Sequence, residues 1–100
     1  MGGRELRSKA RPYDGVAFIG VEKAAETYVA AAFEHGEPRQ IARALGDVAR
    51  ARNMSALAKD IGMSRPALYR ALSGEGKPEF ATIMKVMKAL GLKLTPSAAA

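Results

Sequence analysis

Two arginines and a tyrosine, close together in the chain, are the side chains best suited to binding chemistry: Arg65, Tyr69 and Arg70. A guanidinium group can donate two parallel hydrogen bonds to a guanine edge, and a tyrosine can bond a phosphate or pack on a thymine methyl group. All three would lie at the start and on the outward face of a short helix if Leu68 and Leu72 point into the core. The alternative is that they are ordinary solvated residues, but the pattern around them favours contact with bases or phosphates.

Residues 54–73 supply the two helices that would position these side chains. Ala58 is small enough to fit where two helices cross closely, and Gly62, four residues later, suits a tight turn with positive φ. Leu68, six residues further on, would anchor the second helix in the core. This spacing indicates a helix-turn-helix, in which the second helix lies in the DNA major groove.

Capping residues set the limits of the two helices. Asn53 is suited to cap a helix over residues 55–61, and Ser64 to cap one over about residues 65–73. Pro66 falls in the first turn of the second helix, where a missing N–H group costs little. Ser64 could contact a phosphate as well as cap its helix.

Helical spacing of apolar residues predicts three more helices, over about residues 21–35, 38–52 and 80–90. Gly46 lies within the second of these at a cost of about 1 kcal/mol relative to alanine, which predicts a close helix contact there. Gly36 and Gly91 are expected to end helices. The core stripe expected in the last helix is Phe80, Ile83, Met84, Met87 and Leu90.

The ends of the chain have no such pattern. Residues 1–19 contain Pro12, Gly15 and four basic side chains, which predicts a flexible basic arm. Residues 92–94 alternate as a very short strand would, and residues 95–100 resemble a disordered tail. The expected fold is therefore all-α, with five helices in one domain over residues 20–94 and a possible short C-terminal strand.

Composition narrows the class of protein. The chain has 100 residues, no cysteine and a net charge of +6, so neither a disulfide framework nor a thiolate metal site is expected. It has no apolar run long enough to span a bilayer and no signal-peptide pattern, which predicts a soluble cytoplasmic protein. Residues 39–100 carry eleven bases against four acids, whereas residues 20–38 carry one lysine against four glutamates. The two parts would suit partners of opposite charge.

Other candidate sites have simpler explanations. His35, the single histidine, has no cysteine or second histidine to join it and suits the last turn of a helix. The methionines Met63, Met84 and Met87 are expected to fill the core. The glycines around Glu75 follow a helix, whereas a phosphate-binding loop follows a strand. No nucleophile has a base partner, so we expect neither enzymatic activity nor a cofactor.

Residues 36–94 resemble the HigA-like addiction module antidote proteins, small antitoxins of the lambda-repressor-like (Xre/Cro) class encoded beside RelE/ParE-superfamily toxins. The most specific matching pieces are residues 44–52 (ALGDVARAR), 72–76 (LSGEG) and 89–94 (ALGLKL), and residues 11–14 match the start of the family in character. The resemblance implies an antitoxin that represses its own operon and neutralises a toxin by direct binding. The alternatives are a free-standing repressor without a toxin, or a protein-binding adaptor that has lost DNA binding.

Three surfaces follow from these expectations. A short recognition helix reads only a few base pairs, so we expect a homodimer on double-stranded operator DNA, with the fifth helix and residues 92–94 as candidate contacts. Glu22 and Glu26, one helical turn apart in the acidic segment, are the candidates for contact with the basic toxin; the alternative is that they merely keep the helix soluble.

For Lys77, contact with a phosphate and simple solvation are equally supported, whereas Arg50, Arg52 and Lys59 are expected to be ordinary surface residues. The expected DNA-binding residues are Ser64, Arg65, Pro66, Tyr69, Arg70, Ser73 and Lys77.

Overall fold

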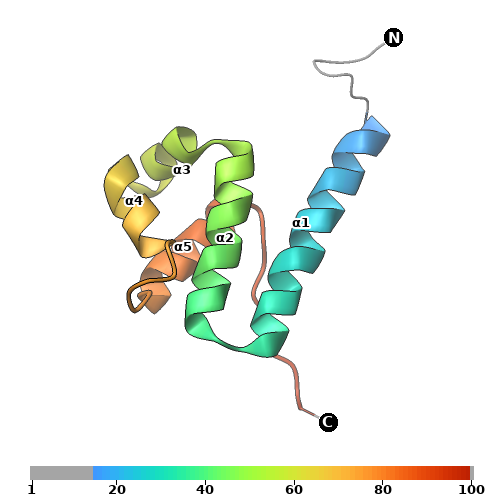
Figure 1. Ribbon diagram of the computed structural model, residues 1–100. Helices are drawn as coiled ribbons and strands as arrows, with labels where there is room; N and C mark the ends of the chain where they lie inside the picture. The colour runs from blue at the N-terminus through green and yellow to red at the C-terminus, as the bar shows by residue number, and fades with distance from the viewer. Residues whose placement is uncertain (1–14, 100) are drawn as a thin grey trace. The chain divides into compact units, whose positions relative to one another are not determined.

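The computed structural model describes residues 15–99, with side chains from residue 22 onward, and contains five helices within that range (Figure 1). They are α1 (Gly15–His35), α2 (Pro38–Arg52), α3 (Met54–Ile61), α4 (Arg65–Ala71) and α5 (Phe80–Ala89). The all-α prediction with five helices is confirmed. The expected strand at residues 92–94 is wrong: no strand occurs between residues 15 and 99, so this segment has no neighbouring strand to pair with.

The chain divides into two units, Met1–Ala30 and Ala31–Ala100. Helix α1 begins at Gly15, about six residues earlier than the sequence predicts, so residues 15–19 of the expected arm are helical. Once a helix has formed, each added residue gains a backbone hydrogen bond, and no proline after Pro12 prevents this extension. The rest of the predicted arm, residues 1–14, lies outside the described residues. Gly36 ends helix α1 as predicted, with φ of 86° and a hydrogen bond from its N–H to the Ala32 carbonyl.

Helices α2 to α5 belong to the second unit and surround its core. Helix α2 has the predicted bounds and is capped by the Glu37 carboxylate, which accepts hydrogen bonds from the N–H groups of Arg39 and Gln40. Helix α3 packs against both α4 and α5, and α2 packs against α3 and α5. The core is formed by apolar side chains of these four helices and of the residues at their C-terminal ends. The buried ones are Ala42, Ala44, Leu45, Val48, Ala49, Met54, Leu57, Ala58, Leu68, Leu72, Ile83, Val86, Met87 and Leu90.

The core stripe of α5 differs from the predicted one. Phe80 and Met84, expected in the core, are 71% and 38% exposed, whereas Val86 is fully buried. The buried set is Ile83, Val86, Met87 and Leu90, whose spacing of three, four and seven residues gives a narrower stripe that is rotated on the helix. Two of the methionines predicted to fill the core therefore do not: Met84 is exposed and Met63 is only half-buried.

None of the helices in the described part of the chain has both the length and the hydrophobicity that crossing a membrane requires.

Candidate nucleic-acid interface

Helix α3 and the turn after it show the geometry expected from Ala58 and Gly62. The Asn53 side chain caps α3 by accepting a hydrogen bond from the Ala56 N–H at 2.9 Å. Gly62 lies in the left-handed region with φ of 74°, and the Met63 N–H closes the turn on the Ala58 carbonyl at 2.9 Å. Ala58 itself is buried. A side chain at residue 62 would strain the backbone although nothing lies within 4 Å of the position.

Helix α4 is short and is held by its cap and its buried leucine. The Ser64 hydroxyl accepts a hydrogen bond from the Ala67 N–H at 3.2 Å, and Pro66 lies in the first turn, both as predicted. Leu68 has no exposed surface, which directs the other faces of this seven-residue helix outward. The exposed side chains of the helix are Arg65, Pro66, Tyr69 and Arg70.

The Arg65 side chain lies over the Tyr69 ring, with its guanidinium carbon 5.3 Å from the ring centroid. This is a cation–π contact between residues one helical turn apart, and it narrows the range of positions that the guanidinium group adopts. The sequence-based prediction names both side chains but does not pair them. Their spacing of four residues on a predicted helix is the signal that would have indicated the pair.

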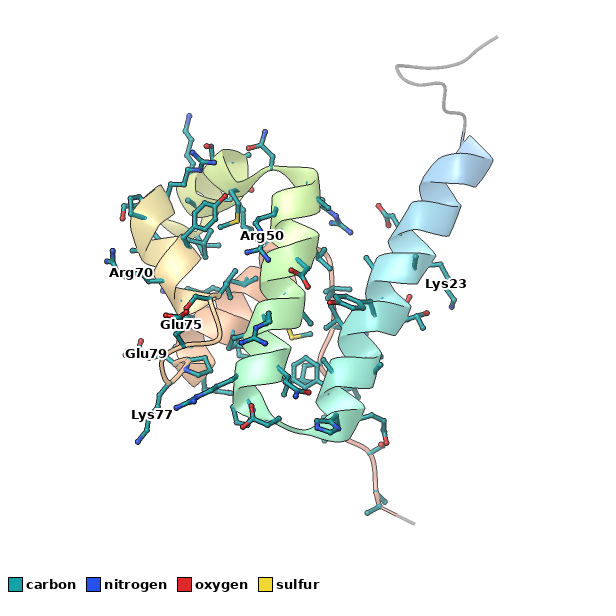
Figure 2. All side chains as sticks on the ribbon, in the orientation of Figure 1. Lys23, Arg50, Arg70, Glu75, Lys77 and Glu79 are labelled. Atoms are coloured by element: carbon teal, nitrogen blue, oxygen red, sulfur yellow. The ribbon has the colours of Figure 1, made fainter. Side chains whose placement is uncertain are left out.

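The loop after α4 is ordered by Ser73, a predicted site residue. Its hydroxyl donates a hydrogen bond to the Arg70 carbonyl at 2.9 Å and accepts one from the Glu75 N–H at 3.2 Å. Ser73 is half-buried, and these bonds hold the backbone of the loop. Lys77 is exposed in the same loop, and Figure 2 shows it projecting away from the helices, as Arg70 also does.

Arg43 of α2 lies against this loop, a contact that the sequence did not predict. Gly74 has φ of 84°, and a Cβ atom placed there would lie 2.9 Å from Arg43 Nε and 3.2 Å from the Arg39 carbonyl oxygen. The loop therefore approaches α2 as closely as a glycine allows. Because the two partners are 31 residues apart in the chain, no local pattern indicates their contact.

Helix α2 also lies directly against the end of α4, as the position of Gly46 predicts. A Cβ atom at Gly46 would lie 2.7 Å from the Leu72 carbonyl oxygen and 3.2 Å from Leu72 Cβ. The backbone of α2 thereby fixes where α4 ends, and with it the position of the exposed residues of α4.

Two arginines near the end of α2, next to α3, have partners within the protein. Arg50 forms an ion pair with Asp47, and Arg52 Nη1 donates a hydrogen bond to the Leu90 carbonyl oxygen at 2.9 Å. The Arg52 bond satisfies a backbone group at the end of α5. Both residues are exposed surface residues, as predicted, although no sequence pattern indicated the Arg52 contact.

The predicted toxin-binding residues belong to a different part of the structure. Glu22 and Glu26 are exposed one turn apart on α1, in the first unit. Among the described residues, no group of three or more histidine, cysteine, aspartate or glutamate side chains is placed to hold a metal ion.

Comparisons with known proteins connect the chain to one family. A family model described as "Probable addiction module antidote protein" matches residues 9–98. An uncharacterized protein of Haemophilus influenzae is 44% identical over 88 residues, which are 88% of this chain and 91% of the relative. No solved structure matches the chain significantly.

Proposed function

The chain belongs to the family of probable addiction module antidote proteins, and on that premise we propose that it is the antitoxin of a type II toxin–antitoxin module. In this role it binds operator DNA to repress its own operon, and it neutralises a RelE/ParE-superfamily toxin by direct binding. Antitoxin membership is supported by the family match along 90 of the 100 residues.

The observation that carries the DNA-binding part is the anchored geometry of α3 and α4. In this proposal they form a lambda-repressor-like helix-turn-helix, and α4 is the recognition helix. Leu68 is fully buried, whereas two arginines and a tyrosine of α4 are exposed, and the helix contains no acidic residue. Arg65 and Arg70 contact base edges, and Tyr69 contacts a phosphate or a thymine methyl group.

The ends of α4 supply the contacts that set its register on the duplex. Ser64 and Pro66 lie at its start, where the Ser64 hydroxyl contacts a phosphate in addition to capping the helix. Ser73 orders the loop at its other end, and Lys77 of that loop binds a phosphate. These contacts are independent of the base sequence, because every nucleotide carries the same phosphate group.

Footprinting and fluorescence anisotropy with the DNA upstream of the gene test this proposal. Arg65→Ala and Arg70→Ala should each cost about 1–3 kcal/mol of binding and relax specificity at one base position. Lys77→Ala should weaken binding to all sequences alike and reduce the salt dependence by about one phosphate contact. Lys93→Ala, an exposed charge outside this surface, is the matched control. Absence of any protected site at low salt would contradict the proposal.

The toxin-binding part is supported by the charge distribution. RelE/ParE-type toxins are small and basic by resemblance, so the acidic face of α1 at Glu22 and Glu26 attracts them while the basic second unit does not. The double variant Glu22→Lys/Glu26→Lys should slow toxin association and leave DNA affinity nearly unchanged. Glu34→Lys, an exposed acid elsewhere on α1, is the control. An unchanged association rate of the double variant would place the toxin on another surface.

A second candidate function is a free-standing repressor that binds DNA with the same two helices, α3 and α4, and has no toxin partner. The two are distinguished by the neighbouring gene: the antitoxin proposal requires an adjacent open reading frame for a small basic protein that binds this chain.

A further inference from the structure

The two arginines exposed on α4 differ in how firmly their side chains are held. The Arg65 guanidinium carbon lies 5.3 Å from the centroid of the Tyr69 ring. Among the described residues, no aromatic ring or acidic side chain holds Arg70 in a similar way, and Figure 2 shows its side chain projecting away from the helices. One arginine therefore has a restricted position and the other does not.

The contact with the ring leaves the hydrogen-bonding groups of Arg65 available. A guanidinium group carries five N–H donors, and in the described part of the chain those of Arg65 have no hydrogen-bond or ion-pair partner. Helix α4 contains no acidic residue that would compete for them. The ring attracts the cation through its π electrons and accepts no conventional hydrogen bond. The Arg65 side chain is thus positioned but still able to bind a ligand.

A positioned guanidinium group with free donors suits guanine better than the other bases. Guanine presents two acceptors, N7 and O6, in the major groove, and an arginine can donate to both at once. Adenine presents one acceptor and one donor there, and thymine presents one acceptor and a methyl group. A side chain that is restricted before binding loses less rotamer freedom when it makes this two-point contact. It also adapts less readily to a wrong base.

We propose that Tyr69 is a positioning residue for Arg65, and that the pair reads an operator guanine more selectively than Arg70 reads its base. Arg70 rotates freely, so it adapts to whichever acceptor is near and discriminates less between bases. The Tyr69 ring carries the positioning role, which leaves its hydroxyl group free to contact a phosphate. This inference rests on the proposed operator binding, but its first test needs no DNA.

Ring-current shifts in NMR spectra of the full chain test the pairing directly. The Arg65 side-chain protons should resonate upfield of the corresponding Arg70 protons, because the Arg65 side chain lies over the Tyr69 ring. Tyr69→Phe should keep this displacement, and Tyr69→Leu should abolish it. Tyr69 is 37% exposed, so both variants should fold, which circular dichroism checks. Absence of the displacement in the wild type would overturn the inference whether or not the protein binds DNA.

Operator DNA that contains 7-deazaguanine tests the selectivity. Replacing each guanine in turn removes its N7 acceptor, and the ratio of the dissociation constants for substituted and natural DNA measures how strongly that guanine is read. At one position of each half-site the wild-type ratio should be at least about fivefold. Arg65→Ala should bring the ratio at that position to about one, whereas Arg70→Ala, the matched control, should leave it unchanged.

The two tyrosine variants then separate positioning from the other roles of Tyr69. Tyr69→Leu should lower the ratio at the Arg65 position by about two- to fivefold, the size of an exposed cation–π contact. Tyr69→Phe should retain the wild-type ratio, because it keeps the ring. If Tyr69→Leu weakens binding to both DNAs equally and keeps the ratio, the inference is wrong although operator binding stands. If the wild type binds no operator DNA at low salt, the proposed function is wrong and this inference falls with it.

Discussion

Replacing Gly46 by alanine tests how closely α2 determines the position of α4. The new Cβ atom would lie 2.7 Å from the Leu72 carbonyl oxygen and 3.2 Å from Leu72 Cβ. An alanine inside a helix gains about 1 kcal/mol over glycine, whereas overpacking costs about 1–3 kcal/mol. Because the closest atom belongs to the backbone and cannot rotate away, the cost lies in the upper part of that range. We expect a net destabilisation of about 1–2 kcal/mol.

Urea denaturation of Gly46→Ala beside Gly76→Ala measures this effect. A Cβ atom at Gly76 would meet nothing within 4 Å, and Gly76 has no positive φ, so its alanine variant should be unchanged or stabilised by about 0.4–1 kcal/mol. Each kcal/mol lost should lower the melting temperature by roughly 4–8 °C in a domain of this size. If Gly46→Ala is as stable as the wild type, the contact between α2 and the end of α4 is looser than these distances imply.

Three other substitutions, measured by the same urea denaturation, test separate features of helices α3 and α4. Leu68→Ala should cost about 2–5 kcal/mol, because it removes a fully buried side chain; a loss below about 1 kcal/mol would mean that Leu68 does not anchor α4. Gly62→Ala should cost about 1–2 kcal/mol through backbone strain alone, since φ is 74° and the space is open, and Gly62→Asn should recover part of the loss. Ser64→Ala should cost about 1 kcal/mol by removing the cap of α4, with Ser64→Asp restoring most of the stability.

The sequence predicts those parts of the fold that depend on local chemistry. The caps at Asn53 and Ser64 and the left-handed glycines Gly36 and Gly62 have the predicted geometry, because each involves atoms only two to four residues apart. The bounds of α2 follow equally from its periodicity. In contrast, the start of α1 at Gly15 is not predicted. Pro12 and Gly15 are typical of non-helical chain, so the apolar residues that follow them are expected in the N-terminal arm.

The parts that could not be predicted depend on contacts between distant residues. Which of two overlapping apolar stripes of α5 faces the core is decided by α2 and α3, so the sequence wrongly places Phe80 inside and omits Val86. The Arg52 bond to the Leu90 carbonyl joins positions 38 residues apart. The contact of Arg43 with Gly74 depends in the same way on the path of a loop. No periodicity within one helix contains this information.

The contact between Gly46 and Leu72 has a consequence for how the protein changes over evolutionary time. Its closest atom is a carbonyl oxygen, which every amino acid carries, so no substitution at residue 72 removes the need for a glycine at residue 46. By contrast, Arg65, Tyr69 and Arg70 are exposed and contribute little to the core. Mutations at these three positions can alter the outward surface of α4 while its backbone stays fixed. Descendants of one ancestral gene would thus diverge first on this face and keep the glycine beneath it.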